Sequence, residues 1–137
     1  MTEPLRIESR ANPLLVALRK AVRDGGAYRR SGQVWLEGDH LCAAAVSRGM
    51  TVSQAVLTDS AWRKSERREL ARHAARVVLL PDAFFGEIST LESPADIGFV
   101  MPLPAPAQPD ATRDAVVLDR LQDAGNVGSI LRSAAAL

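Results

Sequence analysis

Short apolar runs alternate with amphipathic stretches along the first hundred residues. Apolar residues at helical spacing follow Asn12-Pro13 and stop at Gly25-Gly26, which predicts a helix capped by Asn12. Runs of strand-like length occur at 34–36, 54–57, 77–80 and 97–101. Helices are predicted between these runs, at about 39–48, 60–75 and 81–85. This alternation favours an α/β layer sandwich with a largely parallel sheet.

A proline-rich stretch from Pro102 to Pro109 marks the clearest boundary in the chain. Its alternating prolines favour extended polyproline geometry, as in a semi-rigid linker. Beyond it the pattern predicts a strand at 115–118 and a helix that begins at Asn126 or Val127. One strand and one helix cannot enclose a core, so we expect this second domain to need material outside the sequence. The predicted division is a domain at 1–101, a linker at 102–113 and the start of a second domain at 114–137.

Charge is distributed unevenly. Residues 1–80 carry 14 Lys and Arg against 8 Asp and Glu, whereas residues 81–137 carry 3 against 8. Of the 17 basic residues only Lys20 and Lys64 are lysines, and arginine binds phosphate in a bidentate manner and stacks on bases. The basic half therefore favours a polyanionic partner such as RNA. A genome rich in G and C explains the arginine content equally well.

Five arginines are the candidate RNA contacts. Arg29 and Arg30 lie in a predicted polar loop at 28–32, and loops present side chains to irregular RNA. Arg6, Arg10 and Arg19 are expected to extend the same surface. A solvated helix face explains other arginines of the chain better than RNA contact does.

Other polar residues are interpreted as structural. The charged run from Arg63 to Arg68 is expected to be a solvated helix face, and Glu37 is expected to stabilise a turn. Cys42 is the single cysteine, which excludes an internal disulfide and a cysteine-based zinc site. His40 and His73 lack ligand spacing, so no metal is expected.

No apolar run approaches the ~20 residues needed to cross a bilayer. The first residues, Met-Thr-Glu-Pro-Leu-Arg, contain no apolar signal core. A cytoplasmic location without a membrane partner is the simplest interpretation.

The segment 118–134 reads LDRLQDAGNVGSILRSA. Its pattern is that of a strand, a turn of small residues and a helix N-terminus, where free N–H groups favour anions and polar ligands. It lacks the G-x-G-x-x-G of a dinucleotide site and the Gly-Lys-Ser/Thr of a P-loop. On these grounds alone Asn126 is interpreted as a helix cap and Arg132 as a surface residue. The two are six residues apart, nearly two helical turns, so both are expected to lie near one side of the helix.

The same segment resembles the first conserved motif of the SpoU/TrmH RNA methyltransferases, roughly L-D-x-v-x-D-P-x-N-x-G-a-I-x-R-t-A. The agreement includes Asp119, Asp123, Asn126, Gly128 and Arg132. The chain departs from the motif at 124–125, where it has Ala-Gly in place of a Pro-Gly or similar pair. Three further segments, 7–13, 28–38 and 93–100, resemble the family's substrate-binding domain.

The resemblance implies a ribosomal-protein-like α/β sandwich that binds RNA, followed by the truncated start of a SPOUT domain with its trefoil knot. It implies methyl transfer from S-adenosylmethionine to a ribose 2′-hydroxyl, with ribosomal RNA as the expected substrate. Arg132 would orient the nucleophile and stabilise charge, and Asn126 would shape the pocket. The family's later motifs, which form the cofactor site, do not occur in this sequence. The intact protein is expected to form a homodimer, and the 137 residues alone are expected to be inactive.

Two alternatives stay open. The chain could be a non-catalytic module that only docks RNA. It could also be an unrelated structural or partner-binding α/β domain with an accidental match to the motif, in which case it would show no preference for RNA over other polyanions.

Overall fold

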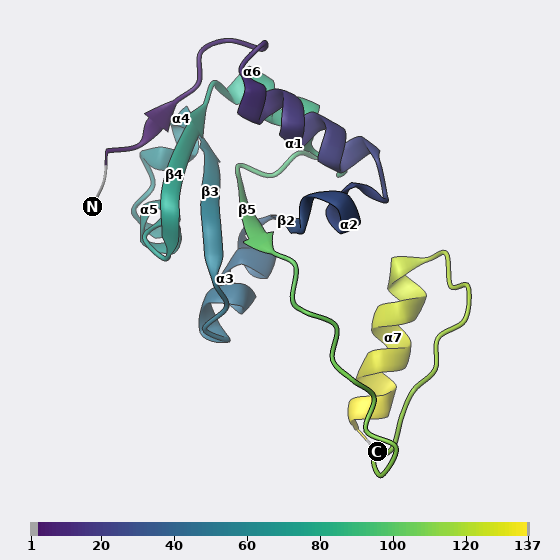
Figure 1. The fold of residues 1–137 in the computed structure, drawn as a ribbon. Coiled ribbons are helices and arrows are strands. Elements are labelled where there is room, and N and C mark those ends of the chain that lie inside the picture. The colour runs from purple at the N-terminus through teal and green to yellow at the C-terminus, as the bar shows by residue number, and fades with distance from the viewer. Residues whose placement is uncertain (1–2, 137) are drawn as a thin grey trace. The chain divides into compact units, whose positions relative to one another are not determined.

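The structure is a computed structural model that describes residues 3–136. Its contacts divide the chain into two units, Met1–Pro104 and Ala105–Leu137. The first unit contains a sheet covered by helices, and the second contains one helix (Figure 1).

The first unit is built on a five-stranded sheet in the order β1-β4-β3-β5-β2. The strands are β1 Leu5–Arg6, β2 Gln33–Glu37, β3 Val52–Thr58, β4 Ala74–Leu80 and β5 Ile97–Pro102. β1, β4 and β3 are parallel, whereas β5 runs antiparallel to both β3 and β2. The sheet is therefore mixed, and the prediction of a largely parallel sheet was wrong for β5. A continuous apolar run marks a buried strand without giving its direction.

The helix α1, Pro13–Arg23, confirms the sequence prediction. The Asn12 side chain caps it by accepting a hydrogen bond from the Leu14 N–H at 3.0 Å. The polar loop predicted at 28–32 was wrong, because residues Ala27–Ser31 form a short helix, α2. This helix ends at Gly32, whose φ of 65° is the left-handed conformation that glycine adopts without strain.

The prediction of one charged helix at 60–75 was also wrong. Two short helices, α4 Asp59–Trp62 and α5 Ser65–Ala71, occupy the first part of that range. Lys64 has an extended conformation, with φ −82° and ψ 129°, and so separates them. Ala74, which pairs with Val52, already belongs to β4.

The other helices of the first unit follow the expected positions more closely. They are α3 Asp39–Ser47, α6 Asp82–Phe85 and the 3₁₀ helix η1 Gly86–Ile88. Gly38, with φ 99°, is the N-cap of α3, although aspartate, as at position 39, is the more usual capping residue. Asp39 Oδ1 instead accepts a hydrogen bond from the adjacent His40 N–H at 3.0 Å.

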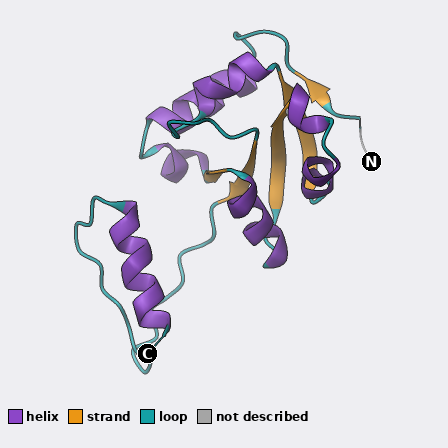
Figure 2. Ribbon diagram, turned by 180° about the vertical axis from the view of Figure 1, so that it is seen from behind, coloured by secondary structure: helices purple, strands orange, loops and turns teal. Residues whose placement is uncertain are grey.

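Helices cover both faces of the sheet, as Figure 2 shows from behind. On one face, Cys42 and Ala45 of α3 pack with Ala61 of α4 and Ala71 of α5 against the sheet. On the other face, α1, α6 and η1 supply the buried side chains Leu15, Leu18, Phe85 and Ile88. The first unit is thus a three-layer α/β/α sandwich, and the predicted layer sandwich is confirmed in this part of the chain.

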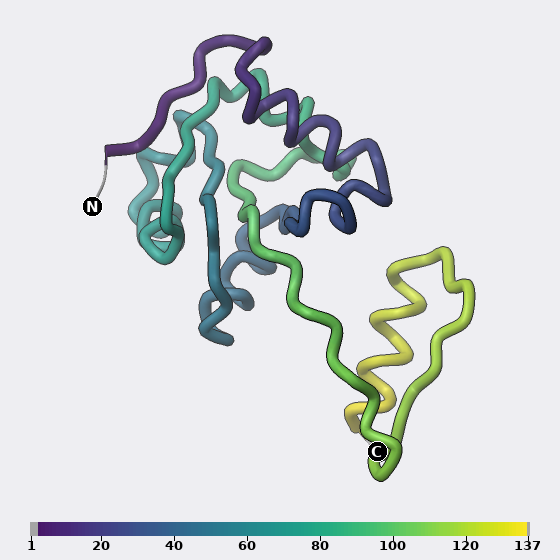
Figure 3. The backbone as a smooth tube through the Cα atoms, viewed as in Figure 1, coloured from purple at the N-terminus to yellow at the C-terminus, as the bar shows by residue number. Residues whose placement is uncertain are grey.

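The second unit has a single element among its described residues, the helix α7, Ala124–Ala135. Residues 103–123 form neither helix nor strand (Figure 3). The strand predicted at 115–118 was therefore wrong; Val117 has 88% of its surface exposed. A strand needs a hydrogen-bonding partner, and these residues have none among those described.

Candidate functional site

Basic side chains gather on α1 and α2, which contact each other. We call them the α1–α2 surface, made of Arg19, Lys20, Arg23, Arg29 and Arg30. All five lie on helices whose apolar residues, such as Leu15 and Leu18, face the core. Arg19, Arg29 and Arg30 of this set are predicted from the sequence, and folding adds Lys20 and Arg23 of α1 to them.

Arg29 and Arg30 differ in how firmly they are held. Arg30 forms an ion pair with Asp24. A hydrogen bond from the Gly26 N–H, together with the one from Arg30, holds the pKa of the Asp24 carboxyl below its usual value. Arg29 instead lies over the Tyr28 ring, 5.5 Å from its centroid, and donates to the Tyr28 hydroxyl at 2.9 Å.

The other two predicted RNA contacts are paired with carboxylates. Arg6 forms an ion pair with Asp59. Arg10 Nε donates to Glu87 Oε1 at 2.6 Å, and its guanidinium lies 4.5 Å from the centroid of the Phe84 ring. The hydrogen bond from Arg10 is the main reason that the pKa of the Glu87 carboxyl lies below its usual value. Both arginines are therefore less available to phosphate than the sequence indicated.

Three cations of the α1–α2 surface stand apart from these pairs. Among the described residues, no carboxylate lies within ion-pair distance of Lys20, Arg23 or Arg29. All three side chains are exposed. Sequence reasoning missed Lys20 and Arg23, although their spacing of three residues places them on the same side of α1. Unpaired, exposed cations are the groups best placed to contact a polyanion.

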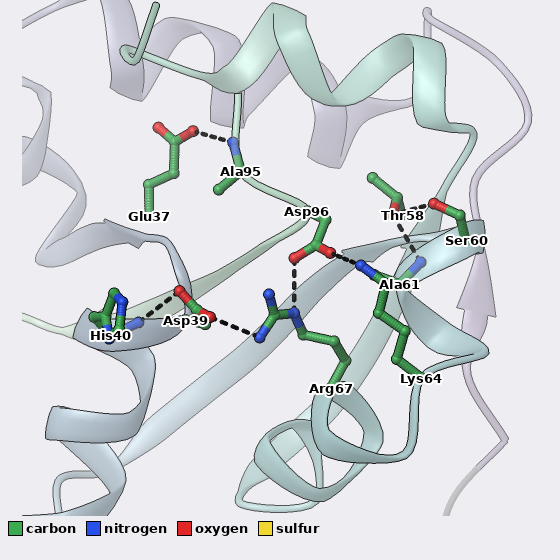
Figure 4. Close-up of polar contacts among 10 residues, drawn as sticks. All are labelled: Glu37, Asp39, His40, Thr58, Ser60, Ala61, Lys64, Arg67, Ala95 and Asp96. Atoms are coloured by element: carbon green, nitrogen blue, oxygen red, sulfur yellow. Dashed lines mark hydrogen bonds and ion pairs between the residues drawn. The ribbon is translucent and has the colours of Figure 1, made fainter. Parts of the chain in front are cut away.

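A network of charged side chains joins the ends of three elements (Figure 4). Arg67 of α5 donates from Nε to Asp96 at 2.8 Å and from Nη1 to Asp39 at 3.0 Å. Lys64 Nζ also donates to Asp96, at 2.8 Å. The network fixes α5 against the start of α3 and against the residue that precedes β5. The predicted solvated face at 63–68 was thus wrong for Arg67, which is 19% exposed.

Hydrogen bonds within the network shift the pKa values of Asp39, Arg67 and Asp96. Burial of Asp96 raises its pKa, but the hydrogen bonds from Lys64 and Arg67 outweigh this effect and leave the pKa below its usual value. The pKa of Asp39 is lowered mainly by the hydrogen bond from Arg67. For Arg67, burial lowers the pKa, and the hydrogen bonds to Asp96 and Asp39 raise it overall. These groups are ionised and mutually satisfied at neutral pH, which is a structural role.

Two further residues have the structural roles that the sequence indicated. The Glu37 carboxylate accepts hydrogen bonds from Ser89 Oγ at 2.5 Å, Thr90 N at 3.1 Å and Ala95 N at 3.3 Å. It therefore holds the loop before β5 onto the end of β2. Cys42 is fully buried, and burial raises the pKa of its thiol to about 12. A thiol with that pKa is protonated at neutral pH and is not a nucleophile.

Of the residues that match the motif, Asn126, Gly128 and Arg132 lie on α7. The helix is capped by Asp123, whose Oδ1 accepts a hydrogen bond from the Gly125 N–H at 3.0 Å. The prediction that Asn126 caps the helix was wrong, since Asn126 lies in its first turn. Arg132 Nη2 donates to Ser129 Oγ at 3.3 Å. The Asn126 and Arg132 side chains are both exposed.

The spacing of Asn126 and Arg132 determines which sides of α7 they occupy. Six residues at about 100° each leave them roughly 120° apart around the helix axis. The expectation that they lie near one side was therefore wrong. No contact in the described part of the chain bears on the catalytic roles predicted for Asn126 and Arg132.

Within residues 3–136, no three His, Cys, Asp or Glu side chains gather in a way that could hold a metal ion. In the same part of the chain, no helix has the length and apolar character needed to cross a membrane.

Comparison with known sequences identifies a relative in Synechocystis sp. This relative is an uncharacterized tRNA/rRNA methyltransferase, 30% identical over 135 residues, which are 95% of this chain and 48% of the relative. A proposed TrmH-family RNA methyltransferase from Porphyromonas gingivalis is 29% identical, with a TM-score of 0.65 over 93% of this chain and 49% of that protein. No protein-family model matches the chain.

Two more distant structures share the fold. An RNA 2′-O ribose methyltransferase has a TM-score of 0.73 and 23% identity over 96% of this chain and 52% of its own length. The SpoU methyltransferase AviRb from Streptomyces viridochromogenes, in complex with the cofactor AdoMet, has a TM-score of 0.67 and 24% identity over 91% and 49%. At these identities the likeness concerns the fold.

Together these findings define an α/β chain with a mixed five-stranded sheet that matches the N-terminal half of SpoU methyltransferases. The chain is homologous to the N-terminal portion of RNA methyltransferases of the SpoU/TrmH family. It spans about half the length of the relatives that it matches.

Proposed function

We propose that this chain is the N-terminal, RNA-binding part of an S-adenosylmethionine-dependent RNA ribose 2′-O-methyltransferase. The observation that carries the proposal is the α1–α2 surface, where Lys20, Arg23 and Arg29 are exposed and have no carboxylate partner among the described residues. Such cations release counterions when they bind phosphates, which drives RNA binding. Because the chain is similar to RNA methyltransferases, RNA is the polyanion that we expect this surface to bind. Ribosomal RNA is the proposed substrate.

The finer parts of the proposal follow from the family resemblance. The first unit corresponds to a ribosomal-protein-like RNA-binding domain, and α7 corresponds to the first helix of a knotted SPOUT domain. The intact enzyme would be a homodimer. Arg132 would hold the ribose 2′-hydroxyl and stabilise the charge that develops on it, because a guanidinium stays protonated and cannot act as a base. Asn126 would line the pocket of the substrate.

The described residues do not fit S-adenosylmethionine. Ile130 and Leu131 of α7 are exposed, as are Asn126 and Arg132, whereas cofactor sites bury most of their ligand. This exposure favours a second candidate function, in which the 137 residues bind RNA without methylating it.

The test of the proposed function is RNA binding by the chain, measured by fluorescence anisotropy over a range of salt concentrations. The triple variant Lys20→Ala/Arg23→Ala/Arg29→Ala is expected to bind single-stranded RNA at least about tenfold more weakly. The plot of the logarithm of the association constant against the logarithm of the salt concentration has a negative slope, and the magnitude of this slope should decrease by about 2. The matched control Arg48→Ala/Arg63→Ala/Arg76→Ala removes the same charge from exposed sites elsewhere on the first unit. Equal losses in the two variants would show that net charge, and not this surface, binds RNA.

The role of Arg132 can be tested in a longer protein that contains this chain and methylates RNA. Arg132→Ala is expected to lower kcat by at least about a hundredfold, because it removes charge stabilisation that is needed in the transition state. RNA affinity should change less than about threefold, since Arg132 is one cation among many. Methylation can be followed by mass spectrometry of digested RNA. Retained turnover with lost RNA binding would refute this role.

A further inference from the structure

Two adjoining hollows lie between α1, α2 and β2. The larger, of about 250 Å³, is lined by residues that include Ala21, Val22, Tyr28 and Thr90. The smaller, of about 90 Å³, is lined mainly by apolar residues such as Leu14 and Leu18. Ala21, Val34 and Trp35 line both, so the two hollows adjoin at these three residues. None of the residues that line these hollows belongs to the charged network formed by Asp39, Lys64, Arg67 and Asp96.

The walls of the larger hollow combine flat apolar surface with a polar rim. Tyr28 and Trp35 contribute two aromatic rings, while Asp24 and Thr90 contribute polar groups. Trp35 Nε1 is buried and donates no hydrogen bond to the described residues. Flat apolar walls with a few polar groups at the edge suit a flat heterocycle with polar edges.

The cations of the α1–α2 surface adjoin this hollow. A shallow depression lined by Arg19, Lys20 and Arg23 also includes Asp24, which lines the larger hollow as well. Asp24 thus joins the larger hollow to the depression that contains Lys20 and Arg23, and Arg29 lies against Tyr28 on α2. None of these three cations has a carboxylate partner in the described part of the chain.

We propose that the larger hollow binds one unstacked base of single-stranded RNA, while Lys20, Arg23 and Arg29 contact the phosphates beside it. The inference rests on the proposed function and assigns it a substrate class and a base site. Single-stranded RNA is recognised by splayed bases that stack on aromatic side chains. Bases of a duplex stay inside the helix and cannot enter the hollow. A protein partner with an apolar side chain would not require three unpaired cations around the site.

The two tryptophans provide a direct test, because they lie in different clusters. Trp35 packs with the core on the α1 side of the sheet, and Trp62 packs on the α3 side. The Trp62→Phe variant leaves Trp35 as the reporter, and Trp35→Phe leaves Trp62. Saturation with a single-stranded RNA of about ten nucleotides, a length within the usual site sizes, is expected to quench Trp35 fluorescence and leave Trp62 fluorescence unchanged. A duplex of the same sequence should quench neither.

A second variant pair tests the stacking surface. Tyr28→Ala is expected to weaken binding of the single strand by about tenfold, whereas Tyr28→Phe keeps the ring and should bind as the parent does. Affinity for the duplex should be equal in all three proteins. If the chain binds no RNA at all, the proposed function fails together with the base site. If anisotropy shows binding while Trp35 fluorescence and the Tyr28 variants are unaffected, the base site alone is overturned.

Discussion

The Trp35 ring lies over Gly98 at a distance that leaves no room for a side chain on that glycine. A Cβ atom at position 98 would lie 2.2 Å from Trp35 Cη2 and 2.9 Å from the Leu36 carbonyl oxygen. Gly98→Ala is therefore expected to displace the indole ring and to lower the free energy of unfolding by about 2 kcal/mol or more. Urea unfolding followed by circular dichroism measures the change.

Gly25→Ala is the matched control, because a Cβ atom there meets nothing within 4 Å. It lies in the connection between α1 and α2, and its effect should stay within about 0.5 kcal/mol. Equal stability of the two variants would mean that the ring does not occupy this position in solution.

Single residues also show where the sequence was a poor guide to the candidate site. Arg6 and Arg10 have the charge of RNA contacts, but each meets a carboxylate far along the chain, Asp59 and Glu87 respectively. Charge spacing within a segment cannot reveal such partners. Lys20 and Arg23 were overlooked for the opposite reason, since a basic helix face gains meaning only when neighbouring elements leave it unpaired.

Among the elements, α5 depends most on charge, through the contacts of Arg67 with Asp39 and Asp96. Arg67→Gln is expected to lower the free energy of unfolding at pH 7 by about 1–3 kcal/mol, because it removes the guanidinium that donates to both Asp39 and Asp96 and leaves Asp96 with Lys64 as its only side-chain donor among the described residues. The pKa values of both aspartates are below their usual value in the folded protein. Their contribution is thus complete above about pH 4 and is lost as the pH falls further.

The difference in free energy of unfolding between the parent and Arg67→Gln, here called the stability gap, should therefore become smaller below about pH 4. Urea titrations at several pH values between 7 and 3 measure this gap. Arg72→Gln serves as the control, since its pair with Glu69 is exposed and should contribute little at any pH. A gap that is constant down to pH 3 would contradict the role of the two carboxylates.

Local patterns predicted the strands β2 to β5 and the helix α1, and they failed where long-range pairing decides the outcome. β1 has only two residues and exists because Leu5 and Arg6 pair with β4. Ala74 and Ala75 have a high intrinsic helix propensity, yet they belong to β4 because this strand pairs with β3. At 115–118, strand-like residues without a partner form no strand.

For the whole molecule, the burial pattern implies that the first unit is independent. Every buried residue among those described lies between Ile7 and Met101, and α7 has none. A protein of residues 1–104 is expected to unfold at the same temperature as the 137-residue chain, within about 3 °C. Thermal melts of the two proteins under one condition make the comparison. A clear drop on removal of residues 105–137 would show that the second unit supports the first.

The position of β5 has a consequence for the order in which the protein folds during synthesis. β2 pairs with β5 alone, and β5 also pairs with β3. When the first ninety residues have emerged from the ribosome, β1, β3 and β4 can assemble, but β2 has no strand to join. Closing the sheet must therefore await Ile97–Pro102, and until then β2 and the nascent α1–α2 surface beside it are held by helix contacts only.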